Sequence, residues 1–335
     1  MICVVALKTA LGICFVFLLV RAIDPSSLER ALARSQPPYL VASLVSKLAG
    51  FLLLAWRSQR LLAPQHSARF RFLIRSHLVA FAGNNLLPLR AGEMLRVVLV
   101  KRFAGVPVRA GLSIAVVERL LDVWSLALLI LLLLGTTGGA GPMPSRLVQV
   151  GVFAGIFALT IVLVALAVRR ARKRCPAALL FFARPVARRV VKWIGETVDQ
   201  SFDTLTGRKL AACGFLTLAF WLSSIVSAAL WIEGMCLELP WYAPLLVVAF
   251  VSLAGALPAT PAQVGTYHYA AFAAASLSGA DSDRAIAFSL IAHAFSIIPF
   301  TLTGIAMGFR DVPSLLEESL QTRQSRGIGT ATPLD

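Results

Sequence analysis

The stretch Ser76–Ala104 reads SHLVAFAGNNLLPLRAGEMLRVVLVKRFA, and it decides what kind of fold this chain adopts. It is apolar at both ends and interrupted in the middle, at Asn84–Glu93, where Pro88 and Gly92 stand. Proline removes a backbone donor and clashes with the preceding turn, whereas glycine permits a reversal of the chain. The pattern predicts two half-helices joined at membrane depth, a re-entrant hairpin.

A second apolar stretch, 243–278, is interrupted in the same way at Leu257–Thr266. Its break contains Pro258, Pro261 and Gly265. We predict a second re-entrant hairpin here. The alternative for each stretch is a pair of ordinary, very short membrane spans.

The composition of the whole chain agrees with a membrane location. Of the 335 residues, 58% are hydrophobic and only 14% are charged, against about 25% charged in a typical soluble domain. The apolar residues come in long blocks rather than in the alternating pattern of an outer-membrane barrel. We therefore expect an all-α polytopic membrane protein. Six full spans are predicted, at 2–22, 39–56, 111–134, 147–168, 210–233 and 284–307.

The placement of basic residues predicts the orientation of these spans. Short loops rich in Lys and Arg stay in the cytoplasm, and both 57–77 and 169–209 are basic, whereas 279–283 is acidic. We therefore expect both termini in the cytoplasm of a bacterium, with the chain in the inner membrane. The first span resembles a secretory signal but lacks a small-residue cleavage site.

An internal repeat is indicated by the spacing of the two breaks. Pro88 and Pro261 are 173 residues apart, and so are Gly92 and Gly265. Three spans separate the two hairpins, so the halves are expected to be inverted, as in transporters with a site at the membrane midplane. The halves would be 39–134 and 210–307 within a domain at 1–310, joined by a span and the basic linker 169–209, with a polar tail at 311–335.

Three charged residues lie within one predicted span. Glu118, Arg119 and Asp122 lie roughly 12–18 Å into the layer, where each charge costs about 2.5–3.5 kcal/mol and is expected to face a partner or a cavity. They form either a gate or proton-coupling network, or a self-neutralised packing cluster. Lys47 stands inside another span, and its expected partner is Glu118, Asp122 or a substrate anion.

The hairpin breaks supply further candidate residues. In the first, Arg90 and Arg96 beside a helix start near Gly92 would suit a phosphate, unless Glu93 simply pairs with Arg96. Asn84 and Asn85 either contact a ligand or satisfy the broken backbone. The second break offers polar residues around its own half-helix start: Thr260, Gln263, Thr266, Tyr267 and His268. His268, together with His293 in the span that follows, is expected either to relay protons or contact a headgroup, or to serve only as a hydrogen-bonding partner.

Several function classes are disfavoured. The net charge of +16 follows the loops beside the membrane, so it does not indicate nucleic-acid binding. The cysteines show no metal-binding or disulfide spacing, and no catalytic or ATP-binding signature occurs. We therefore expect no metal, no cofactor and no enzyme activity. Expected partners are membrane lipids, anionic or lipid-linked; a separate soluble biosynthetic enzyme and a homo-oligomer are both compatible with the sequence.

The motif Asn85-x-x-Pro88-x-Arg90-x-Gly92-Glu93-x-x-Arg96, followed by Glu118-Arg119-x-x-Asp122, resembles the transmembrane-domain family of lysylphosphatidylglycerol synthases, also described as flippase-like. A third motif, Pro258-x-x-Pro261-x-x-x-Gly265, adds to the resemblance. The resemblance covers about residues 5–310 and implies lipid translocation or handling of lipid-linked intermediates. Family members often have Gly-Gly where Ala262-Gln263 stands here, and an acidic residue at the position of His268.

The resemblance implies a lipid transporter that moves an anionic phospholipid or lipid-linked intermediate between leaflets. Fused members carry an aminoacyl-transferase domain after the membrane part, and the polar tail here is too short for one, so we expect no lysyl transfer. Two alternatives are an intramembrane enzyme that modifies a lipid headgroup and a non-catalytic membrane subunit of an envelope-synthesis complex.

Overall fold

The computed structural model describes residues 32–62, 66–87, 91–136, 207–256 and 261–309, together with Glu29, Arg170, Glu196 and Asp199. The predicted spans at 2–22 and 147–168, most of the linker 169–209, the tail 311–335, and Pro88, Arg90, Pro258 and Thr260 lie outside the described residues. Every regular element in the described part is helical. In chain order they are α3 (Pro37–Leu62), α4 (Phe70–Leu86), α5 (Gly92–Ala104), α6 (Val108–Thr136), α10 (Gly207–Gly234), α11 (Ala243–Ala256), the 3-10 turn η2 (Pro261–Gln263), α12 (Thr266–Leu277) and α13 (Ser282–Phe309).

Within the described ranges, three helices are long and apolar enough to cross a membrane. They are α3, α10 and the segment Ser282–Gly308 of α13. The helix α6 is also long, but it carries Glu118, Arg119 and Asp122 in its interior.

The helix ends follow from local backbone chemistry. Leu87, which ends α4, is extended at φ −91° and ψ 147°, as expected for a residue that precedes a proline. Gly105 ends α5 in the left-handed conformation at φ 66°, which glycine adopts without a steric cost. Asp281 accepts a hydrogen bond from the backbone N–H of Arg284 at 2.9 Å and so caps the start of α13.

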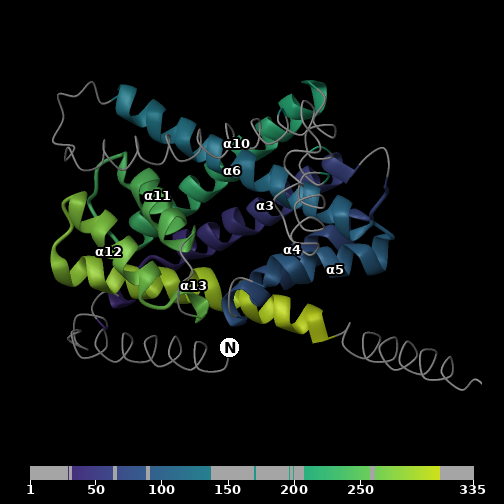
Figure 1. The fold of residues 1–335 in the computed structure, drawn as a ribbon. Coiled ribbons are helices and arrows are strands. Elements are labelled where there is room, and N and C mark those ends of the chain that lie inside the picture. Colours follow the sequence, from purple (N-terminus) through teal and green to yellow (C-terminus); the bar gives the residue numbers. More distant parts are fainter. Residues whose placement is uncertain are drawn as a thin grey trace, which may run out of the picture.

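The antiparallel pair α3 and α10 forms the centre of the molecule (Figure 1). The backbone N–H of Gln36, just before α3, donates to the carbonyl of Gly234 at the end of α10. Further along α3, Ser43 contacts Ser227 and Arg57 contacts Thr217. From one contact to the next, the residue numbers increase along α3 and decrease along α10, so the two helices run in opposite directions.

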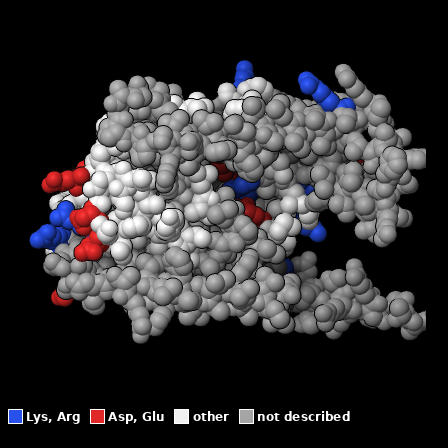
Figure 2. All heavy atoms as spheres, turned by 60° about the vertical axis from the view of Figure 1, so that its left-hand side comes forward, with Lys and Arg blue, Asp and Glu red and all other residues white. Residues whose placement is uncertain are grey.

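The remaining helices pack around this pair in two groups. The helices α4, α5 and α6 enclose one apolar core with the C-terminal half of α3 and the start of α10, around Leu73 and Val117. A larger core lies among α10, α11, α12 and α13, around Phe288 and Ala271. In Figure 2 acidic and basic side chains gather at one end of the molecule, and a second, smaller mixed group of acidic and basic side chains is visible near the middle of this face.

Candidate functional site

A buried ion network joins α3, α5 and α6. Glu118, fully buried in α6, pairs with Arg96 of α5 at 2.5 Å and accepts a hydrogen bond from Ser58 of α3, also at 2.5 Å. Arg57 of α3 is 1% exposed and pairs with Asp122. Two helices thus meet α6 through opposite charges inside the apolar core.

Further contacts extend this network on both sides. Glu93 pairs with Arg96 at 3.2 Å and with Arg119 at 3.3 Å, and Arg119 also lies 3.6 Å from Asp122. Three arginines are thereby matched by three carboxylates, so the network carries no net charge. Such buried pairs hold elements in register, and removing one partner leaves an uncompensated buried charge.

The network contains side chains that the sequence analysis missed. Arg57 was assigned to a cytoplasmic loop, which is wrong, because α3 continues to Leu62 and buries Arg57 against Asp122 and Thr217. His77 of α4 lies 2.8 Å from the Ser58 hydroxyl. The apolar pair Leu61-Leu62 after Arg60 is the signal that could have placed Arg57 inside the helix.

A second polar centre is formed by Lys47, which lines a cavity of about 280 Å³. The expected pairing of Lys47 with Glu118 or Asp122 is wrong, because those carboxylates bind arginines. Its ammonium instead lies 5.9 Å from the ring centre of Phe81 and 5.8 Å from that of Phe300. No carboxylate in the described part of the chain pairs with Lys47.

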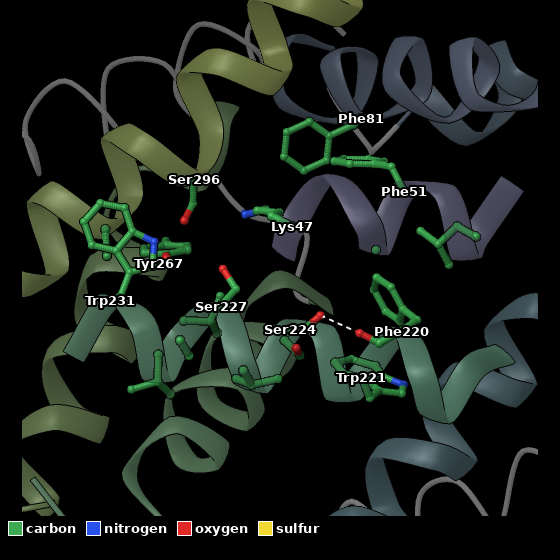
Figure 3. Close-up of a pocket in the computed structure, with 18 of the residues that line it drawn as sticks. Lys47, Phe51, Phe81, Phe220, Trp221, Ser224, Ser227, Trp231, Tyr267 and Ser296 are labelled. Carbon is green, nitrogen blue, oxygen red and sulfur yellow. Dashed lines mark hydrogen bonds between the residues drawn. The ribbon is translucent and has the colours of Figure 1, made fainter. Parts of the chain in front are cut away.

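The cavity wall is mostly apolar and aromatic. In Figure 3 the ammonium of Lys47 points into the cavity on the side of Ser227 and Ser296. Helices α3, α4, α10, α11, α12 and α13 all contribute to the wall. The aromatic side chains that line it are Phe51, Phe81, Phe220, Trp221, Trp231, Tyr267 and Phe288.

Two histidines lie at the second break, next to this cavity. The rings of His268 and His293 are 4.4 Å apart, and His293 is 4.8 Å from the ring of Tyr267, which lines the cavity. His293 donates from Nε2 to the carbonyl of Ala262 at 2.8 Å, and His268 Nδ1 accepts from the N–H of Gly265 at 3.3 Å. Both histidines therefore support the turn before α12.

The other candidate residues lie at the helix ends. Asn85 donates to the hydroxyl of Thr301 in α13 at 2.9 Å. Asn84 lies close to Gly92, where an added Cβ would come 2.7 Å from its Oδ1. Thr266 donates to the carbonyl of Gln263 at 3.2 Å. The predicted residues are thus not gathered in one place: the ion network and the Lys47 cavity are two separate centres, and these asparagines and Thr266 lie outside both.

The two centres share the helices α3 and α10. Along α3, Leu54 lines the cavity and Arg57 belongs to the network. Along α10, Trp221 lines the cavity, and Thr217, one turn earlier, binds Arg57. The separation of ten positions from Lys47 to Arg57 corresponds to about 15 Å along a helix. A change in the packing of α3 on α10 would therefore affect both centres.

The chain is 25% identical over 304 residues to a protein of Haloferax volcanii that bears the name Glycosyltransferase AglD. The match covers 81% of this chain and 49% of the relative, so the chain spans about half the length of that curated relative. The expectation that this chain is not an enzyme is thereby corrected, since a relative carries the name of one. At this identity the activity itself is not transferred.

The family model described as "Lysylphosphatidylglycerol synthase TM region" matches residues 5–304, which is nearly the whole chain. The match includes both helix breaks, the ion network and the Lys47 cavity. It confirms the resemblance found in the sequence, and with the apolar helices it identifies a multi-pass membrane protein. The chain belongs to the family of the lysylphosphatidylglycerol synthase transmembrane region.

Proposed function

We propose that this protein binds the anionic headgroup of a membrane lipid, or of a lipid-linked intermediate, in the Lys47 cavity and moves it between leaflets. The observation that carries the proposal is a lysine that pairs with no carboxylate of the described residues and lies in an apolar, aromatic-lined cavity. A charged side chain at membrane depth is costly unless it has a partner. A phosphate supplied by the ligand would be that partner.

The remaining cavity wall suits the apolar part of a lipid. Phe51, Phe220 and Trp231 offer broad apolar surfaces, and the wall also holds the hydroxyls of Ser224, Ser227 and Ser296, of which the last two lie on the side of the Lys47 ammonium (Figure 3). Ligand sites commonly combine a mostly apolar wall with a few polar groups that set orientation. This composition supports a ligand with a charged headgroup and an apolar tail.

The arrangement of helices supports the inverted repeat and the two re-entrant hairpins as parts of the mechanism. Lys47 on α3 and Phe220 on α10 are 173 residues apart, which is the spacing of the two breaks, and both line the cavity. Since α3 and α10 are antiparallel, the cavity would lie on the axis that relates two inverted halves. A site on such an axis suits alternate exposure to the two sides of the membrane.

The ion network is proposed as the gate. It connects the second half-helix of the first hairpin to α6 through Arg96 and Glu118. Any movement of α5 away from α6 must break this pair and leave a buried charge, so the network favours one closed arrangement. We keep proton coupling through Glu118 and Asp122 as part of the proposal. If transport by Glu118→Gln and Asp122→Asn keeps the full pH dependence of the unaltered chain, proton coupling is contradicted.

The central test is transport by the purified chain in vesicles that contain headgroup-labelled phosphatidylglycerol in one leaflet. Lys47→Met should slow leaflet exchange about 10- to 100-fold, since a hydrogen bond to a charged group contributes about 1.5–3 kcal/mol. Lys47→Arg should retain part of the rate, and Lys101→Met, which changes an exposed lysine of α5, should retain all of it. Equal rates for Lys47→Met and the unaltered chain would reject the proposal.

A second candidate function is chemistry on the lipid-linked headgroup, which the relative named as a glycosyltransferase favours. The two functions can be distinguished in the same vesicles when the lipids are extracted and their masses are measured by mass spectrometry. Labelled lipid of unchanged mass in the opposite leaflet supports transport. Lipid of changed mass that requires Lys47 supports the enzyme.

A further inference from the structure

The C-terminal end of α4 gathers oxygen atoms that lack donors. The side-chain Oδ1 atoms of Asn84 and Asn85 are both buried, and neither accepts a hydrogen bond. Asn85 is 1% exposed, and its amide nitrogen donates to the hydroxyl of Thr301. A buried acceptor without a partner destabilises the fold, so two neighbouring ones need an explanation.

The backbone adds further acceptors at the same place. The last four carbonyls of a helix lack partners within it. Among the described residues, the carbonyl of Gly83 accepts from the N–H of Leu87 at 2.8 Å. The carbonyl of Asn84 would normally accept from residue 88, but Pro88 has no N–H. The C-terminal end of a helix is also negatively polarised. Side chains and backbone therefore both offer oxygen lone pairs.

We propose that this end of α4 binds a monovalent alkali cation, with Na⁺ as the ion to test. The oxygens of Asn84, Asn85 and Thr301 would be its side-chain ligands. Half-helix C-terminal ends and unwound carbonyls coordinate Na⁺ in membrane transporters. These ligands carry no net charge, which favours a monovalent ion, because divalent cations are usually held by carboxylates. The carboxylate of Glu93 at the start of α5 is already paired with Arg96 and Arg119.

The position of this site links the two groups of helices. Asn84 and Asn85 belong to α4, whereas Thr301 belongs to α13. A cation bound there would hold α4 against α13 and would stabilise the folded state in proportion to its occupancy. The inference concerns a site separate from the Lys47 cavity, and it stands or falls without any lipid.

The test is thermal unfolding of the purified full chain in detergent at constant ionic strength. Replacing N-methyl-D-glucamine chloride by NaCl should raise the melting temperature by about 2–4 °C, which corresponds to an ion near tenfold above its dissociation constant. Thr301→Val keeps the side-chain shape and removes one ligand, and it should reduce the shift. Asn85→Asp adds a negative charge and should lower the Na⁺ concentration needed for half of the shift.

A matched control is Ser276→Ala, which removes another buried hydroxyl without a partner, from α12. This variant should keep the full response to Na⁺. The inference is overturned if NaCl, LiCl and KCl give the same melting temperature as N-methyl-D-glucamine chloride. It is also overturned if Thr301→Val and Asn85→Asp respond as the unaltered chain does. Because no lipid is present, neither result bears on the proposed function.

Discussion

At the scale of residues, the charged groups in the core differ sharply in exposure. Glu118 is fully buried and Arg57 is 1% exposed, whereas the side chain of Arg119 is 57% exposed. All three belong to one network, yet the surroundings of each side chain determine how much it contributes to the free energy of unfolding. Removing one partner of a buried pair costs far more than removing an exposed one.

The first prediction concerns the buried pair. Glu118→Gln should lower the free energy of unfolding by about 3–5 kcal/mol, because Arg96 loses its buried partner. Arg119→Gln should lower it less, because Glu93 and Asp122 keep Arg96 and Arg57 as partners. Denaturant unfolding of both variants in the same detergent checks this. A similar loss of unfolding free energy in the two variants would contradict the special contribution of the Glu118–Arg96 pair.

The second prediction concerns the turn before α12. Ala262 has φ 53° and Gln263 has φ 56°, in the left-handed region that costs a non-glycine residue about 1–2 kcal/mol. Ala262→Gly should therefore raise the melting temperature slightly. Ala271→Gly, at a fully buried position inside α12, should lower it. If both glycines were destabilising, strain at Ala262 would not be the cause.

At the scale of elements, close approach between helices depends on small residues. An added Cβ at Gly304 of α13 would lie 2.2 Å from the carbonyl oxygen of Leu78 in α4. An added Cβ at Gly92 would lie 2.0 Å from the carbonyl oxygen of Ala80. Glycine thus allows α4 to touch both α5 and α13, as small residues do at membrane-helix contacts.

The third prediction follows from this contact. Gly304→Ala should destabilise the protein by about 1–3 kcal/mol or more, because overpacking forces α13 away from α4. Gly308→Ala lies on the same helix, but its Cβ would come no closer than 3.7 Å, to Val79. That variant should be tolerated. Parallel thermal melts of the two variants provide the comparison, and equal stability would mean that the α4–α13 contact is loose.

At the scale of the whole molecule, the antiparallel pair α3 and α10 determines which segments share an end. The loop after α10 and the loop before α13 lie at one end, and the start of α4 lies at the other (Figure 1). Asp281 and Arg71 are exposed at these two ends. From the positive-inside rule we expect the arginine-rich end to face the cytoplasm.

The fourth prediction tests this orientation. In a variant whose five cysteines are replaced by serine, Asp281→Cys should react with an impermeant maleimide in intact cells, and Arg71→Cys should react only in inverted vesicles. The basis is the asymmetry of Lys and Arg between loops. Labelling of both positions from one side would contradict the proposed topology.

The helical membrane class, the family and the approximate helix breaks were all readable from the amino-acid sequence. The breaks at Leu87 and before Thr266 were predictable because proline and glycine act on the backbone of their own segment. Apolar blocks likewise report burial without knowledge of the neighbouring helix.

Which polar groups contact one another became known only from the packing of the helices. Arg57 binds Asp122, Asn85 binds Thr301, and Lys47 lies in a cavity away from any described carboxylate. These partners are far apart in the chain, and their meeting depends on how α3, α4 and α6 pack and cross. Local propensity carries no information about such crossings, because the contact is set by side-chain packing between helices.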